Sequence, residues 1–149
     1  NVFNYRNFYN GGGVAVGDIN NDGYVDLYFT ANQTSNKLYL NNGDWTFTDI
    51  TETSGTSGKQ AWSTGAAMAD VNGDGWLDIY VANSGDIKGD SRANELFLNN
   101  GDNTFTESAD AWGVADQGLS THGVFFDYDR DGDLDAYILN NSFIFVINK

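Results

Sequence analysis

Three short loops of oxygen-bearing side chains are the parts of this sequence best suited to chemistry. They read DINNDGYVD (residues 18–26), DVNGDGWLD (70–78) and DYDRDGDLD (127–135). Positions 1, 3, 5 and 9 of each loop carry carboxylate or amide oxygens, and position 7 can offer its backbone carbonyl. Glycine at position 6 permits the sharp turn that folds such a loop around a hard cation, so the spacing predicts one calcium ion per loop, three in all. The predicted ligands are Asp18, Asn20, Asp22, Tyr24 (carbonyl) and Asp26; Asp70, Asn72, Asp74, Trp76 (carbonyl) and Asp78; and Asp127, Asp129, Asp131, Asp133 (carbonyl) and Asp135.

Calcium explains these loops better than the alternatives. One alternative is an ordinary turn in which an Asp or Asn side chain hydrogen-bonds to the backbone of the turn. This explains one acidic residue per turn, but not three or more carboxylates within nine residues, because these repel each other unless a cation is bound. An EF-hand needs Glu at position 12, where this chain has Phe29, Val81 and Ile138. Magnesium is the lesser choice because it demands strict octahedral geometry. Zinc is disfavoured because the chain has one histidine and no cysteine.

The loops differ in charge. Loops one and two each carry three carboxylates, whereas loop three also has Asp129 and Asp133, partly offset by Arg130. We therefore expect loop three to bind calcium most tightly and the other two to bind weakly, in the range of about 10⁻⁴–10⁻³ M typical of extracellular modules. Because the loops join strands directly, the calcium is expected to be structural.

Short strands must hold these loops. Small-residue segments precede them at residues 13–16, 65–68 and 123–126, and apolar segments follow at 27–30, 79–82 and 136–139. The apolar segments do not alternate with polar residues, which indicates burial on both faces.

A second repeated pattern completes the unit. NKLYLNNGDWTFT (residues 36–48) and NELFLNNGDNTFT (94–106) agree at 10 of 13 positions and read as two strands around an Asn-Gly turn. The result is an all-β chain of four-stranded antiparallel units, which is typical of β-propeller blades; a sandwich is the weaker alternative. The units span approximately residues 11–52, 63–109 and 120–142 of a partial propeller covering 1–149.

The third unit ends after its second strand, so the chain holds about two and a half blades. Propellers usually need about four to eight blades. We expect a fragment of a larger propeller, or a ring whose remaining blades come from other chains. The tail at residues 143–149 does not continue the repeat.

Composition excludes several classes of partner. Of the 149 residues, 7 are Lys or Arg and 21 are Asp or Glu, for a net charge of −14, which argues against nucleic acid and anionic membranes. No apolar run suits membrane insertion, and residues 1–10 do not resemble a signal peptide. An enzyme is not expected, because no G-x-S-x-G, P-loop or G-x-G-x-x-G motif is present and 11 of the 21 acids lie in the three loops.

Three further features are candidates for binding. His122 either faces a central channel or is an ordinary strand-end residue. The second unit is longer than the first by six residues within 85–92, either a binding loop or a tolerated insertion. Three tryptophans, Trp45, Trp62 and Trp112, either stack on sugar rings or, as we expect, pack between blades.

The acidic loops, the strands before them and the NxLxLNNGDxTFT segments together resemble FG-GAP/VCBS repeats, which occur in integrin α-chain propellers. Within that group, the chain is most similar to bacterial extracellular proteins of the cartilage acidic protein and ASPIC/UnbV type. The resemblance covers nearly all of residues 11–142. It implies a propeller, usually seven-bladed, that binds calcium in its loops and is secreted or lies at the cell surface, with a role in adhesion or in binding protein or carbohydrate. The alternative is the non-catalytic propeller part of a secreted enzyme that acts on polysaccharide.

Overall fold

The computed structural model describes residues 11–32, 34–59, 62–84 and 92–141. In these residues the chain forms antiparallel strands that pair in sequence order and one short helix, which confirms the all-β prediction. The first sheet contains β1 (Val14–Gly17), β2 (Asp26–Phe29), β3 (Lys37–Asn41) and β4 (Phe47–Asp49). The second contains β5 (Ser63–Ala69), β6 (Asp78–Asn83), β7 (Glu95–Asn99) and β8 (Phe105–Glu107), and the third pairs β9 (Leu119–Phe126) with β10 (Asp135–Asn141).

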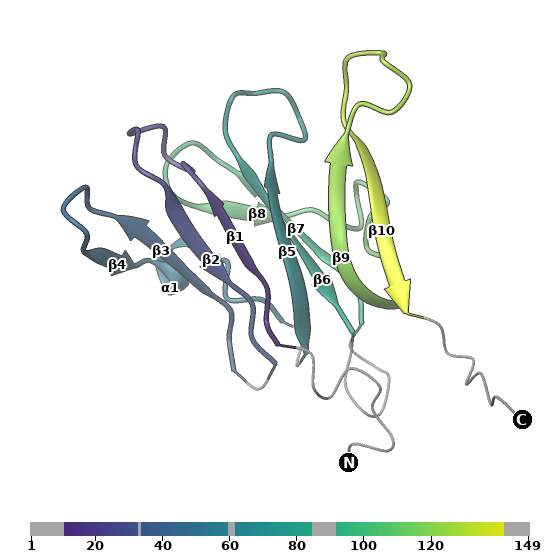
Figure 1. The fold of residues 1–149 in the computed structure, drawn as a ribbon, viewed down its shortest axis with the longest axis horizontal. Coiled ribbons are helices and arrows are strands. Elements are labelled where there is room, and N and C mark those ends of the chain that lie inside the picture. The colour runs from purple at the N-terminus through teal and green to yellow at the C-terminus, as the bar shows by residue number, and fades with distance from the viewer. Residues whose placement is uncertain (1–10, 33, 60–61, 85–91, 142–149) are drawn as a thin grey trace, which may run out of the picture.

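Equivalent strands have the same register in the first two sheets. Leu27 of β2 lies opposite Tyr39 of β3, and Ile79 of β6 lies opposite Phe97 of β7. Figure 1 shows the three sheets in succession, with the acidic loops projecting from the same end of each. The sheets are propeller blades, as the repeats predict.

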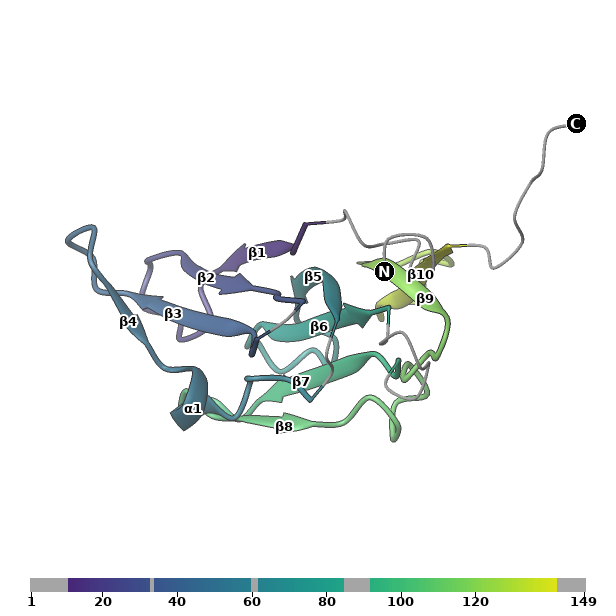
Figure 2. The same ribbon diagram turned by 90° about the horizontal axis from the view of Figure 1, so that it is seen from below.

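The hydrophobic core lies between sheets. One cluster joins Tyr28 and Leu38 of the first sheet to Ile79 and Phe97 of the second. A second cluster is centred on Tyr80, whose ring meets Phe125 of the third sheet edge to face with centroids 5.4 Å apart. Figure 2 shows the sheets side by side, seen from below. Burial of apolar side chains in the two interfaces between them stabilises this arrangement.

The first strands of neighbouring sheets approach each other closely, which explains their small residues. A Cβ atom on Gly13 would lie 2.7 Å from the Thr64 carbonyl oxygen, and one on Gly65 would clash with the Thr121 carbonyl. Across the next gap, the Thr64 hydroxyl donates to the carbonyl of Ser120 (2.8 Å). Larger side chains at these glycines would separate the sheets.

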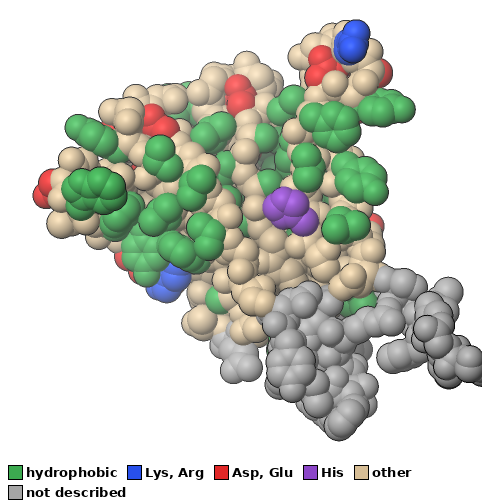
Figure 3. Space-filling model, viewed as in Figure 1, with side chains coloured by type: hydrophobic (Ala, Val, Ile, Leu, Met, Phe, Trp, Pro, Cys, Tyr) green, Lys and Arg blue, Asp and Glu red, His purple; other side chains and the backbone are tan. Residues whose placement is uncertain are grey.

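The expectation that every second strand is buried on both faces holds only for the central sheet. All six residues of β6 are buried, whereas Phe29 in β2 and most residues of β10 are exposed. The reason is that the described part of the chain places sheets on both sides of β6 and on one side only of β2 and β10. On the face shown in Figure 3, hydrophobic side chains gather over the first sheet and over β9 and β10.

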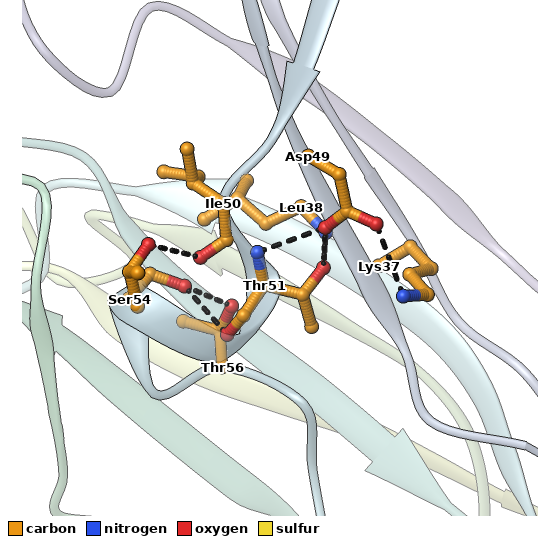
Figure 4. A network of polar contacts seen from close by, with 8 residues as sticks. Lys37, Leu38, Asp49, Ile50, Thr51, Ser54 and Thr56 are labelled. Carbon is orange, nitrogen blue, oxygen red and sulfur yellow. Dashed lines mark hydrogen bonds and ion pairs between the residues drawn. The ribbon is translucent and has the colours of Figure 1, made fainter.

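A short helix after β4, α1 (Thr51–Ser54), was not expected from the sequence. It is anchored by Asp49, which accepts hydrogen bonds from the Thr51 amide (3.0 Å) and hydroxyl (2.6 Å) and forms an ion pair with Lys37 (3.0 Å; Figure 4). These hydrogen bonds, with the Lys37 contact, lower the pKa of Asp49 to about 2. The Thr51 hydroxyl oxygen in turn accepts the amide of Leu38, so the helix is fastened to β3 of the first sheet. No helix in the described residues is long and apolar enough to cross a membrane.

Candidate metal centre

Loops one and two fold in the same way around their first aspartate. The two carboxylate oxygens of Asp18 accept the amides of Asp22 (3.1 Å) and Gly23 (2.8 Å). Asp70 accepts the equivalent amides of loop two at 3.0 and 2.8 Å. Both loops therefore curl around a carboxylate held at their centre.

The backbone of all three loops is left-handed at positions 4 and 6. At position 6 the residue is always glycine, with φ between 88° and 98°. At position 4 the residues are Asn21 (φ 56°), Gly73 (72°) and Arg130 (65°). Asn and Gly favour this conformation, but arginine gives no such signal, so the position 4 requirement could not be recognised from loop three.

The aspartate at position 9 is the first residue of each sheet's second strand, and it is buried in loops one and two. Asp26 accepts the amides of Ile19 (2.9 Å) and Asn41 (2.8 Å), and Asp78 accepts their equivalents at 3.0 and 2.8 Å. Burial raises the pKa of both carboxyls, against the opposing effect of these hydrogen bonds. A carboxylate oxygen has a second lone pair, so the same atoms remain able to bind a cation.

Position 3 separates loop three from the other two. In loops one and two the asparagine amide donates to the position 5 aspartate, Asn20 to Asp22 at 2.9 Å and Asn72 to Asp74 at 2.8 Å. Asp129 in loop three has no N–H to offer. The position 5 carboxylate is therefore partly satisfied by a side-chain amide in the first two loops, and loop three lacks this contact.

Loop three brings three carboxylates together. Asp127, Asp129 and Asp135 each place one oxygen within 4.8 Å of the other two. Nearby, the pKa of Asp133 is raised by its hydrogen bond with Asp131 and by the charges around it. Crowded acids of this kind hold a proton or a cation, and an all-oxygen set suits a hard ion such as calcium. The carbonyls of Tyr24, Trp76 and Asp133 stay predicted ligands.

Two asparagines that support the loops were interpreted from the sequence only as turn residues. Asn99 donates from Nδ2 to the carbonyls of Ile19 in loop one (2.8 Å) and Leu77 in loop two (3.1 Å). Its equivalent, Asn41, donates to the Val25 carbonyl (3.1 Å). The signal available was the LNNGD segment that follows loops one and two, at residues 40–44 and 98–102.

The other sequence candidates have mixed outcomes. The expectation that the three tryptophans pack between blades is wrong for Trp45 and Trp112, which are 94% and 45% exposed, whereas Trp62 is buried. Trp45 sits at a hairpin tip rather than on a sheet face, and Trp112 lies in a turn after β8. His122 is exposed on β9 and lines an open hollow of about 530 Å³ with Gly11–Gly13, Thr64, Gly65 and Thr121. The insertion, except Arg92, and the tail at 143–149 lie outside the described residues.

Known proteins share these loops. The sequence matches the FG-GAP-like repeat family over residues 18–81 and 70–138. Cartilage acidic protein 1 of Xenopus tropicalis is 40% identical over 78 residues, which is 52% of this chain and 12% of that protein. The human and mouse proteins of the same name are 37% and 34% identical over 76 and 73 residues, about half of this chain. The matched segment spans only 11–12% of the length of these relatives.

All three are vertebrate proteins and lend no support to the expected bacterial source. With both overlapping matches falling on the acidic loops and the strands that flank them, the chain belongs to the FG-GAP-like repeat family.

Proposed function

We propose that this chain is a calcium-stabilised, non-catalytic part of an extracellular β-propeller that binds a protein or carbohydrate partner. The observation that carries the proposal is the group of three carboxylates in loop three, Asp127, Asp129 and Asp135, within 4.8 Å of one another. Its repulsion is relieved by a divalent cation, and the oxygen ligands at the predicted positions suit calcium at about 2.3–2.6 Å.

A structural role for calcium follows from where the loops lie. Each ends on the first residue of a sheet's second strand, and in the first two sheets that residue, Asp26 or Asp78, is buried. Loop one also contacts loop two directly, because the Asn21 side chain donates to the Gly75 carbonyl (3.1 Å). An ion that orders these loops therefore stabilises the junction between blades.

An extracellular location is supported by the calcium affinity expected of the loops and by the name of the relatives. Sites with dissociation constants of about 10⁻⁴–10⁻³ M fill in the millimolar calcium outside cells and empty at cytoplasmic levels. The relatives' name, cartilage acidic protein 1, is compatible with a matrix location. The exposed apolar faces of the first and third sheets are proposed to pack against further blades, from a longer chain or from other chains.

Calorimetric titration with calcium chloride tests the proposal. We expect three sites, with loop three the tightest and Asp129→Asn weakening that site toward the other two. Asp110→Asn removes the same charge outside the loops and should leave all three sites unchanged. Binding at ten times Kd adds about 1.4 kcal/mol per site, so a chelator should lower the melting temperature. An unchanged melting temperature in excess EDTA, with metal shown to be gone, would refute structural calcium.

A further inference from the structure

Trp45 is placed where its side chain contributes little to the fold. It lies in the loop between β3 and β4, its side chain is 94% exposed, and its backbone is left-handed (φ 67°). A bulky residue in this conformation costs about 1–2 kcal/mol. Neither burial nor backbone preference therefore explains a tryptophan at this position.

The loop, and not the tryptophan, imposes the conformation. The Asn42 amide donates to the Thr46 carbonyl at 3.0 Å, and the equivalent Asn100 amide donates to Thr104 at the same distance in the second sheet. There the residue equivalent to Trp45 is Asn103, with φ 66°. Asparagine tolerates left-handed backbone well, so the second unit has the residue that this loop favours.

The exposure of Trp45 does not result from a missing neighbour. Asn103 belongs to the central sheet, which has sheets on both sides, and it too is exposed. A blade packed on the open face of the first sheet would therefore leave the equivalent hairpin tip accessible.

A tyrosine stands beside this tryptophan. Tyr24, Asn41, Gly43 and Trp45 line a hollow of about 230 Å³. The Tyr24 ring lies against the Cα atom of Gly43, where a Cβ atom would come within 2.7 Å of it, and its side chain is about half exposed. Gly43 thus fixes the ring at the edge of the hollow.

The chemistry of the hollow favours a cation over a sugar. The Asn41 side chain is already engaged, since its Oδ1 accepts the Gly43 amide (3.0 Å) and its Nδ2 donates to Val25. What remains are two aromatic rings, negative charge and few polar groups, namely the Tyr24 hydroxyl and one N–H of Asn41. The Asp44 carboxylate next to Trp45 has its pKa lowered by hydrogen bonds from Thr46, and the chain has a net charge of −14. Aromatic faces in a negative field attract guanidinium and ammonium groups, whereas sugar hydroxyls need directed polar partners.

We propose that the hollow between Tyr24 and Trp45 binds an arginine side chain of a partner protein. The proposal rests on the binding role put forward above and names the chemistry of the partner. Arginine is the more frequent cation at such sites because its flat guanidinium group stacks on aromatic rings.

A pair of reciprocal variants separates binding from folding. Trp45→Asn installs the residue that the second unit carries at the same left-handed position, so the fold should be kept or slightly stabilised. Asn103→Trp places a tryptophan in the equivalent loop, where the Trp76 ring lies against Gly101 as Tyr24 lies against Gly43. We expect the first variant to remove a site and the second to create one.

Titration with an acetylated tetra-arginine amide, followed by NMR of the indole N–H signals, measures the site. We expect four indole N–H signals, one from each tryptophan, and the signal that Trp45→Asn removes is that of Trp45. We expect the peptide to shift the Trp45 signal and to bind about 2- to 30-fold more weakly to Trp45→Asn. Equal affinity for both proteins would mean that bulk charge alone attracts the peptide and would overturn the proposal. A shift caused by chitotetraose and not by the peptide would overturn it in favour of carbohydrate.

Calcium titration of the same samples keeps the two proposals apart. Peptide binding that is insensitive to Trp45→Asn while all three calcium sites fill refutes the arginine site alone. Specific peptide binding in a protein that takes up no calcium supports the arginine site and refutes the calcium proposal alone.

Discussion

Replacing Asn99 with alanine should destabilise the protein far more than replacing Asn41, although both occupy the same position in the repeat. The Asn99 side chain is 95% buried, donates to Ile19 and Leu77, and accepts the Gly101 amide at 2.9 Å. Its bond to Ile19 crosses from the second sheet to loop one. Alanine removes three hydrogen bonds and leaves buried carbonyl groups without this donor.

The magnitude follows from those bonds. At about 0.5–1.5 kcal/mol each, with the added penalty for unsatisfied buried groups, Asn99→Ala should lower the free energy of unfolding by about 2–4 kcal/mol. For a chain of this size that lowers the melting temperature by about 6–13 °C. Asn41→Ala loses one bond to Val25 and one from Gly43 at a site open to water, so about 1 kcal/mol is expected.

Urea unfolding of both variants in calcium buffer provides the measurement. The slope of free energy against urea should stay the same, so that the midpoint reports stability. Because Asn99 holds carbonyls in both loops and Asn41 holds one in loop one, calcium binding at loop one should weaken in both variants, and binding at loop two should weaken in Asn99→Ala alone. Equal destabilisation by the two substitutions would refute the reasoning that the contact between sheets, and not the local turn, makes Asn99 important.

Three other outcomes follow from the structure. Gly43→Ala should lower the melting temperature and displace the Tyr24 ring, because the new methyl group meets that ring and the backbone is left-handed (φ 79°); unchanged tyrosine NMR signals would contradict this. Burial raises the pKa of Glu95 above 4.5, so its contribution to stability is present below that pH and is lost as the pH rises through the folded-state value. The melting temperature of Glu95→Gln minus that of the wild type should therefore be more positive at neutral pH than at pH 4. The same difference at both pH values would argue against a raised pKa. Asp49, with its pKa lowered to about 2, stabilises above pH 3.8, and this stability is lost as the pH falls toward 2. Between pH 3.8 and about pH 2, the melting temperature should thus fall less steeply in Asp49→Asn than in the wild type. An equal fall in the two proteins would count against a lowered pKa for Asp49.

The sequence was most informative where a pattern repeats. Three copies of the loop and two of the LNNGD segment were sufficient to predict the blades and their four strands, because each copy repeats the same turn residues at the same internal spacing. Contacts between sheets left no comparable pattern. The bond from Asn99 to Ile19 joins residues 80 positions apart, and the exposure of Trp45 depends on the shape of a hairpin tip. The helix α1 was missed because four residues are too few to show helical periodicity.

The position of the hydrophobic clusters between sheets means that a single repeat has no interior of its own. Tyr28 is covered by the second sheet, and Tyr80 by the third. A single repeat is therefore not expected to fold alone, and each repeat added by gene duplication contributes one new hydrophobic interface with its neighbour. Cutting the chain between two repeats would expose one half of a hydrophobic cluster to water. Unfolding of one blade should therefore destabilise the next blade along the chain.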